Sequence, residues 1–198
     1  MKFITKVKIE LDREISDLDR FALDFTTILK KHVSYVIVSG YVSILLGRAR
    51  ASEDIDIIIP KIDFSTFQSL VRDLKKNGFY CLNAEKDTDI FEYFKDDLPV
   101  RFAYQDSVIP NIEMKWGKNQ FDELALRKTI EVILSEGKLC ISHLELQIAF
   151  KEAVLKSPKD MQDARHLRKV TEGYIDEQLI QQYKGQLHEF FYKRKSKK

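Results

Sequence analysis

The chain has 198 residues, 32% of them charged, and its formal net charge at pH 7 is only +2. Five positive charges lie in the tail 193–198, so the remainder carries about −3, which argues against a broad basic surface for nucleic acid. The length suits one α/β domain with a helical extension, or one and a half small domains, and it is enough to bury a sizeable core.

The two cysteines and the N-terminal segment favour a cytoplasmic chain. Cys81 and Cys140 lack the spacing of a zinc site, and we expect both to be reduced. Residues 1–10 alternate charged and apolar side chains, unlike a signal peptide, and no segment approaches the roughly 20 apolar residues of a membrane span. We therefore expect a cytoplasmic protein without a membrane partner.

The first part of the chain predicts alternating strands and helices. Residues 3–10 alternate as a strand does, and an amphipathic helix follows over 13–31, with apolar residues about one turn apart. The polar segment 86–97 is loop-like or weakly helical. Between and beyond these segments the sequence predicts helices at 40–47 and 64–76 and strands at 35–38, 54–59, 79–82, 100–104 and 112–116.

After residue 116 the sequence predicts a hairpin over 127–134 and 138–141, and then helices over 142–156, 159–171 and 175–192. Ser142 is expected to cap the first helix, with Glu145 completing a capping box. Pro158 is expected to begin the second helix and Gly173 to end it. The predicted organisation is an α/β (α+β) domain over 1–141, a helical region over 142–192 and a basic disordered tail over 193–198.

Two aspartates alternate on the apolar strand 54–59. Successive strand side chains point to opposite faces, so Asp54 and Asp56 share one face. Two like charges among isoleucines are costly unless a cation lies beside them, and oxygen ligands suit Mg²⁺. A solvated edge strand is the alternative interpretation.

A small pair, Ser39-Gly40, separates the apolar strand 35–38 from a short helix. A glycine lets the backbone approach a ligand closely, and N–H groups at a helix start favour phosphate. Arg48 and Arg50 lie between this pair and the aspartates; either could hold a triphosphate or pair with Glu53. A phosphate cradle followed by a metal-binding carboxylate pair indicates nucleotidyl or phosphoryl transfer.

The combination of Ser39-Gly40 with Asp54-Ile55-Asp56 resembles the nucleotidyltransferase superfamily of DNA polymerase β and kanamycin nucleotidyltransferase. Residues 47–56 look closest to its small prokaryotic branch, which includes minimal nucleotidyltransferases and the nucleotidyltransferase toxins of abortive-infection systems. The order Ser-Gly departs from the family's Gly-Gly or Gly-Ser. The resemblance implies a mixed sheet flanked by helices, a nucleoside triphosphate substrate and two Mg²⁺ ions.

The resemblance also implies a third carboxylate on a later strand beside the aspartate pair. Glu113, in the middle of NIEMKW, is the best candidate, and Asp106, near a turn, is the second choice. An outward-facing Glu on an edge strand is the alternative interpretation. Asp54, Asp56 and Glu113 are therefore the expected metal ligands.

Residues 141–167 look like the helical tail of these small transferases. Lys151 interrupts an apolar series, and a lysine there either extends to water or meets an anion; the resemblance favours the anion. Asp160 and Asp163 lie one turn apart, where the resemblance implies nucleotide binding. Stabilisation of the helix dipole is a competing explanation for this acidic pair.

The sequence thus predicts a metal-dependent nucleotidyltransferase that moves a nucleoside monophosphate from a triphosphate to a hydroxyl of a protein, a tRNA or a small molecule. Asp54, Asp56, Glu113 and Lys151 are expected to be catalytic, and the nucleotide is expected to contact Ser39, Gly40, Arg48, Arg50, Asp160 and Asp163. Two alternatives remain open: an interaction protein, such as an antitoxin-like partner of a toxin, and a degenerate nucleotide-binding module.

Overall fold

The protein is described here from a computed structural model that covers residues 1–52 and 54–193. Its strands form one nine-stranded mixed sheet in the order β1-β2-β8-β9-β3-β4-β7-β6-β5. The strands are β1 (Lys2–Thr5), β2 (Lys8–Glu10), β3 (Val36–Val38), β4 (Asp54–Ile59), β5 (Phe79–Cys81), β6 (Val100–Tyr104), β7 (Asn111–Trp116), β8 (Thr129–Leu134) and β9 (Gly137–Ser142). The predicted α/β class with a mixed sheet is confirmed. Glu53 and most of the tail predicted over 193–198 lie outside the described residues.

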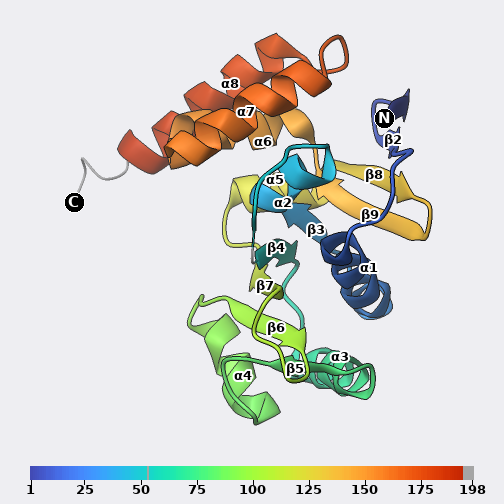
Figure 1. Cartoon of the computed structure of the whole chain (residues 1–198). Helices are drawn as coiled ribbons and strands as arrows, with labels where there is room; N and C mark the ends of the chain where they lie inside the picture. The colour runs from blue at the N-terminus through green and yellow to red at the C-terminus, as the bar shows by residue number, and fades with distance from the viewer. Residues whose placement is uncertain (53, 194–198) are drawn as a thin grey trace.

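Helices cover both faces of this sheet (Figure 1). On one face Phe25 contacts Phe102, and Phe94 stacks on Trp116, with ring centroids 5.7 and 5.2 Å apart. On the other face Phe121 and Leu146 line a cavity together with Ile58 of β4. The helices are α1 (Asp17–Leu29), α2 (Gly40–Leu45), α3 (Phe64–Lys76), α4 (Asp87–Lys95), α5 (Gln120–Arg127), α6 (Leu144–Phe150), α7 (Pro158–Val170) and α8 (Glu177–His188).

The N-terminal segment 3–10 is a hairpin and not the single strand predicted. β1 and β2 pair antiparallel, with Phe3 opposite Ile9. The hydroxyl of Thr5 accepts a hydrogen bond from the Val7 backbone at 3.2 Å, which stabilises the reversal. An alternating pattern fits both arms of a hairpin equally well, so it cannot reveal where the chain turns.

Two helices depart from the predictions for the middle of the chain. The segment 86–97 contains a regular helix, α4, and α5 lies where no element was predicted. The side chain of Asn119 caps α5 by accepting hydrogen bonds from the backbone N–H groups of Phe121 and Asp122 at 2.8 and 3.2 Å. An asparagine before an acidic first turn is a helix-start signal that could have predicted α5.

The predicted capping box at Ser142 is wrong. Ser142 pairs with Thr129 at the end of β9, and α6 begins two residues later. The carboxylate of Glu145 instead accepts a hydrogen bond from the Asp176 backbone at 3.2 Å. Strand pairing with β8 therefore outcompetes the local cap. The helix predicted to reach residue 156 is also interrupted, because α6 continues as a π-helical turn over Lys151–Leu155.

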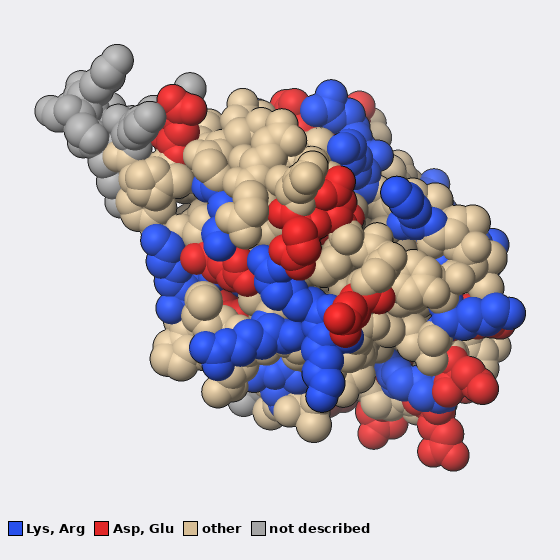
Figure 2. All heavy atoms as spheres, turned by 90° about the horizontal axis from the view of Figure 1, so that it is seen from above, with Lys and Arg blue, Asp and Glu red and all other residues tan. Residues whose placement is uncertain are grey.

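The three C-terminal helices lie together at one end of the molecule, away from α3 and α4 (Figure 1). Seen from above, this end carries basic and acidic side chains side by side (Figure 2). The two signs are therefore intermixed on this face and not separated into single-sign surfaces. Within the described residues, no helix combines the length and the apolar character needed to cross a membrane.

Candidate active site

The strand register brings the predicted carboxylates together at the centre of the sheet. Asp56 on β4 pairs with Val38 on β3 and with Glu113 on β7, and Glu113 pairs in turn with Arg101 on β6. Directly paired residues point to the same face of a sheet. Asp54, two residues before Asp56, also points to this face. The structure therefore places the three predicted metal ligands on one face, on two neighbouring strands.

The carboxylate of Glu113 already has a partner. Its Oε2 accepts hydrogen bonds from Nη2 and Nε of Arg101, at 2.8 and 3.1 Å. Across residues 1–52 and 54–193, no three His, Cys, Asp or Glu side chains are grouped so that they could hold a metal ion. Glu113 would have to turn away from Arg101 to join Asp54 and Asp56 around a cation.

The electrostatics of Asp56 nevertheless fit a divalent cation. Burial and repulsion from Glu113 raise the pKa of Asp56 to about 6, and Asp54 adds to this increase. Lys115 and the Ser39 hydroxyl oppose it. A cation would relieve the same repulsion, and the oxygen donors of Asp54 and Asp56 are those that Mg²⁺ prefers. The residues present therefore suit such an ion.

The Ser39-Gly40 pair has an unusual backbone. Ser39 has φ 63° and ψ −134°, a backbone conformation that residues other than glycine rarely adopt. Its N–H donates a hydrogen bond to Oε1 of Gln147, 3.0 Å away, which ties the strand end to α6. Since the usual family order begins with glycine, the inverted order places serine where a glycine would be unstrained.

The space in front of Gly40 contains an arginine. A Cβ atom at Gly40 would lie 3.0 Å from Nη2 and 3.2 Å from Nη1 of Arg50. The sequence suggested that this glycine leaves room for a ligand. In the structure it leaves room for the guanidinium of Arg50, so a phosphate approaching this point would meet that cation.

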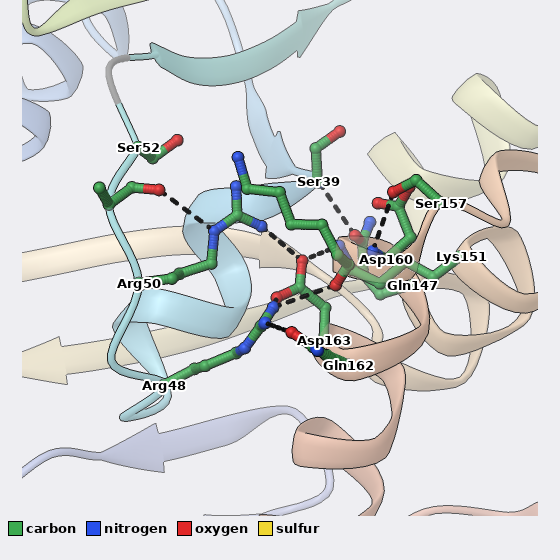
Figure 3. Close-up of polar contacts among 12 residues, drawn as sticks. Ser39, Arg48, Arg50, Ser52, Gln147, Lys151, Ser157, Asp160, Gln162 and Asp163 are labelled. Carbon is green, nitrogen blue, oxygen red and sulfur yellow. Dashed lines mark hydrogen bonds and ion pairs between the residues drawn. The ribbon is translucent and has the colours of Figure 1, made fainter.

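Three cations converge on one buried carboxylate, that of Asp163 on α7 (Figure 3). Oδ2 lies 2.9 Å from Nζ of Lys151 and 2.7 Å from Nη1 of Arg50, and Oδ1 pairs with Nη1 of Arg48. Arg48, Arg50 and Lys151 are called the cation cluster below. Asp163 is fully buried and Lys151 is 1% exposed.

Helix α7 also holds the segment that carries both arginines, residues 46–52, which we call the arginine loop. Arg48 donates hydrogen bonds to the Lys159 carbonyl and to Oε1 of Gln162, at 3.1 and 2.8 Å. Nε2 of His166 donates to the Leu46 carbonyl at 3.1 Å. This loop leads directly into β4, so α7 fixes the approach to the aspartate pair.

Lys151 lies in the electrostatic field of the aspartates. Burial is the main cause that lowers its pKa to about 8; Arg50 and Arg48 act in the same direction, whereas Asp160 and Asp56 oppose the shift. Lys151 also lines a cavity of about 50 Å³ together with Ser39 and Gln147. The ammonium is therefore within electrostatic range of Asp56, although its direct partner is Asp163.

Asp160 has a local role that sequence spacing did not separate from ligand binding. The Ser157 hydroxyl accepts a hydrogen bond from the Asp160 backbone at 3.1 Å, which caps α7. In return the Ser157 hydroxyl donates to the Asp160 carboxylate. Asp160 thus belongs to the helix cap, and its charge also acts on Lys151 and Arg50.

Two further residues of the site were not singled out from the sequence. Lys115 follows Glu113 by two positions on β7, points to the same face and lines the cavity beside Ser39. The period of the strand could have identified it. Gln147 binds the Ser39 backbone, and a glutamine within an apolar helix carries no sequence signal for this contact.

Comparison with solved structures identifies the fold. The solution structure of the antibiotic-resistance factor ANT(2'')-Ia is 12% identical, with a TM-score of 0.58 over 91% of this chain and 97% of that chain. The crystal structure of ANT(2")-Ia in complex with adenylyl-2"-tobramycin is 14% identical, with a TM-score of 0.53 over 87% of this chain and 99% of that chain. An antigenic nucleotidyltransferase-like protein from Paracoccidioides brasiliensis is 16% identical, with a TM-score of 0.49 over 88% of this chain and 89% of that chain. No family model and no curated protein matches the sequence. The chain therefore shares its fold with ANT(2'')-Ia.

Proposed function

We propose that the protein is a metal-dependent nucleotidyltransferase, which moves a nucleoside monophosphate from a nucleoside triphosphate to a hydroxyl group. One observation carries the proposal: the aspartates of β4 lie close enough to the cation cluster for Asp54 to act electrostatically on Arg50 and Asp56 on Lys151. Nucleotidyl transfer needs carboxylates that bind metal ions and, next to them, positively charged side chains that bind the phosphates.

Each of these two groups has a role that follows from its charge. Asp54 and Asp56, joined by Glu113, would hold two Mg²⁺ ions, which in such sites lower the pKa of an acceptor hydroxyl and neutralise phosphate charge. The triphosphate would bind beside Ser39 and Gly40. The guanidinium of Arg50 lies directly in front of Gly40, where it would contact the triphosphate oxygens. Glu113 is the carboxylate nearest to Asp56 in register and the proposed acceptor of the hydroxyl proton.

The transfer balances without a further reactant. The acceptor oxygen forms a bond to the α-phosphorus, the bond from that phosphorus to its bridging oxygen breaks, and pyrophosphate leaves. The hydroxyl proton passes to Glu113 and then to water. Lys151, with Arg50, would stabilise the negative charge that develops on the departing pyrophosphate.

The surrounding charges favour a neutral or anionic acceptor. Asp163 is paired with three cations, and Glu113 is assigned to the metal ions and to the acceptor proton, so neither carboxylate is left to recognise a polycation. The cavity beside Ser39 is lined by Lys115 and by apolar side chains of α5 and α6. A hydroxyl on a protein, on a tRNA or on an uncharged small molecule fits these surroundings.

Labelling with each radioactive nucleoside triphosphate, Mg²⁺ and a cell lysate tests the proposal. We expect a labelled acceptor with the native chain, and none after chelation of Mg²⁺ or with Asp56→Ala. Asp73→Ala removes an exposed carboxylate that contacts His32 and is the matched control. Full Mg²⁺-dependent labelling by Asp56→Ala would disprove the two-metal assignment.

One observation favours a second candidate, a non-catalytic interaction protein such as an antitoxin-like partner of a toxin. Glu113 is engaged by Arg101, and the described residues contain no ready group of three metal ligands. On this alternative the chain keeps the fold, acts by binding a protein partner and transfers no nucleotide. A labelled product in the assay above would exclude it.

A further inference from the structure

The carboxylate of Asp163 faces cations of its own protein with both oxygens, although only Oδ2 accepts hydrogen bonds. Oδ1 is engaged by Arg48, and Oδ2 by Arg50 and Lys151. The side chain has no exposed surface. A residue that contacts a nucleotide, binds a metal or takes a proton needs a free and reachable oxygen. The sequence suggested nucleotide contact at this position, and the geometry instead suits an anchor for other side chains.

The charges around Asp163 do not balance as a structural ion pair would. Three cations share one carboxylate, which leaves an excess of two positive charges in the cluster. The additional negative charges acting on Lys151 and Arg50 come from Asp160, Asp54 and Asp56. If metal ions engage Asp54 and Asp56, only Asp163 and Asp160 remain against the three cations, and the net positive charge of the cluster then favours an anion.

The partners of Asp163 come from separate parts of the chain. Arg48 and Arg50 lie on the arginine loop, and Lys151 lies on the π-helical turn after α6. Each long side chain loses conformational entropy when it is held in one rotamer. Because Asp163 already holds all three side chains, this entropy is lost during folding and not during ligand binding.

We propose that Asp163 is a positioning residue that holds Arg48, Arg50 and Lys151 in place for the phosphates of the nucleotide. This inference rests on the proposed function, because it assigns a polyphosphate to the cation cluster. The simplest alternative is that Asp163 is only a counter-charge, and the two roles predict opposite effects of its removal on the affinity for an anion. If Asp163 were only a counter-charge, its removal would strengthen the binding of an anion.

Calorimetry with inorganic tripolyphosphate and Mg²⁺ separates the two roles without any acceptor. For Asp163→Asn we expect binding at least about tenfold weaker than for the native chain, because the cations lose their common anchor. ATP with Mg²⁺ should weaken by the same factor, since the loss concerns only the phosphates. Unchanged or tighter binding of tripolyphosphate by Asp163→Asn overturns the inference.

Glu152→Gln is the matched control. Glu152 also gathers two cations within the helical region, but its partners are Arg168 and Lys184, neither of which belongs to the cation cluster. This variant should lose stability and keep its affinity for tripolyphosphate. A comparable loss of affinity in Glu152→Gln would show that any weakened ion-pair hub has this effect, and would also overturn the inference.

Asp163→Asn leaves a buried ammonium without its carboxylate and can fail to fold. The double variant Lys151→Met with Asp163→Asn removes both charges and is compared with Lys151→Met alone. Positioning predicts weaker tripolyphosphate binding in the double variant, and a counter-charge predicts tighter binding. If the native chain binds neither tripolyphosphate nor ATP, the proposed function fails together with this inference. If the native chain binds both and the Asp163 variants bind them equally well, this inference alone fails.

Discussion

Replacing Lys151 by Met tests whether its buried ammonium serves chemistry or folding. Burial lowers the pKa of Lys151 from 10.5 to about 8. Because one pKa unit corresponds to about 1.4 kcal/mol, this shift corresponds to a cost of about 3 kcal/mol at pH 7, before the ion pair with Asp163 is counted. Met keeps most of the packing and removes this cost, while Asp163 retains Arg48 and Arg50 as partners. We therefore expect Lys151→Met to be at least as stable as the native chain and to lose nucleotidyl transfer.

The pH dependence of unfolding measures the same quantity independently. Between pH 8 and 10.5 the unfolded chain binds more protons at Lys151 than the folded chain, so stability rises with pH in this window. The native chain should gain about 3 kcal/mol over Lys151→Met across it, and the full cost should be present below pH 8.

Urea denaturation at several pH values between 7 and 10.5, with the nucleotide-labelling assay in parallel, tests both expectations. Lys184→Met, which removes a lysine paired with Glu152, is the activity control. A destabilisation of Lys151→Met by about 3–5 kcal/mol at pH 7, the usual result of breaking a buried pair, would show that the contact with Asp163 outweighs desolvation and would refute the reasoning.

Three further predictions follow from the backbone and from a buried histidine. Ser39→Gly should be more stable than Ser39→Ala by about 1–2 kcal/mol in urea denaturation, because glycine adopts φ 63° without strain; equal stabilities would contradict this. Gly40→Val should displace the Arg50 guanidinium and weaken ATP binding in calorimetry, whereas Gly185→Val, which has open space around it, should not; equal affinities for ATP would contradict the contact. Burial lowers the pKa of His143 to about 4, so the unfolded chain binds more protons between pH 4 and 6.5. The native chain should lose about 3 kcal/mol relative to His143→Gln as pH falls through that window, and parallel stability curves would rule this out.

The acidic face of the site could be predicted from the sequence because it depends on local periodicity. Alternation on the strand places Asp54 and Asp56 together, and the same period on the later strand identifies Glu113. The position of β7 beside β4 could be expected only from the resemblance to a known family. The pairing of Glu113 with Arg101 was not predicted, since it requires the register of a third strand.

The cation cluster could be predicted only as separate residues. Arg48 and Arg50 were placed near the phosphates because they lie between two motifs, and Lys151 because it interrupts an apolar series. Their common partner, Asp163, lies 113 residues after Arg50, and no sequence period spans that distance. The close approach of Arg50 to Gly40 is similarly a result of tertiary packing.

The long separation between Arg50 and Asp163 has a consequence for synthesis of the protein. Closing a loop of 113 residues costs more chain entropy than forming the local hairpins, so the cluster is expected to assemble late in folding. During translation, β3, α2 and β4 emerge long before α7 exists. A nascent chain on the ribosome would carry the aspartate pair without its fixed phosphate-binding cations. If the cation cluster binds the nucleotide as proposed, affinity for the nucleotide is expected only after α7 has emerged.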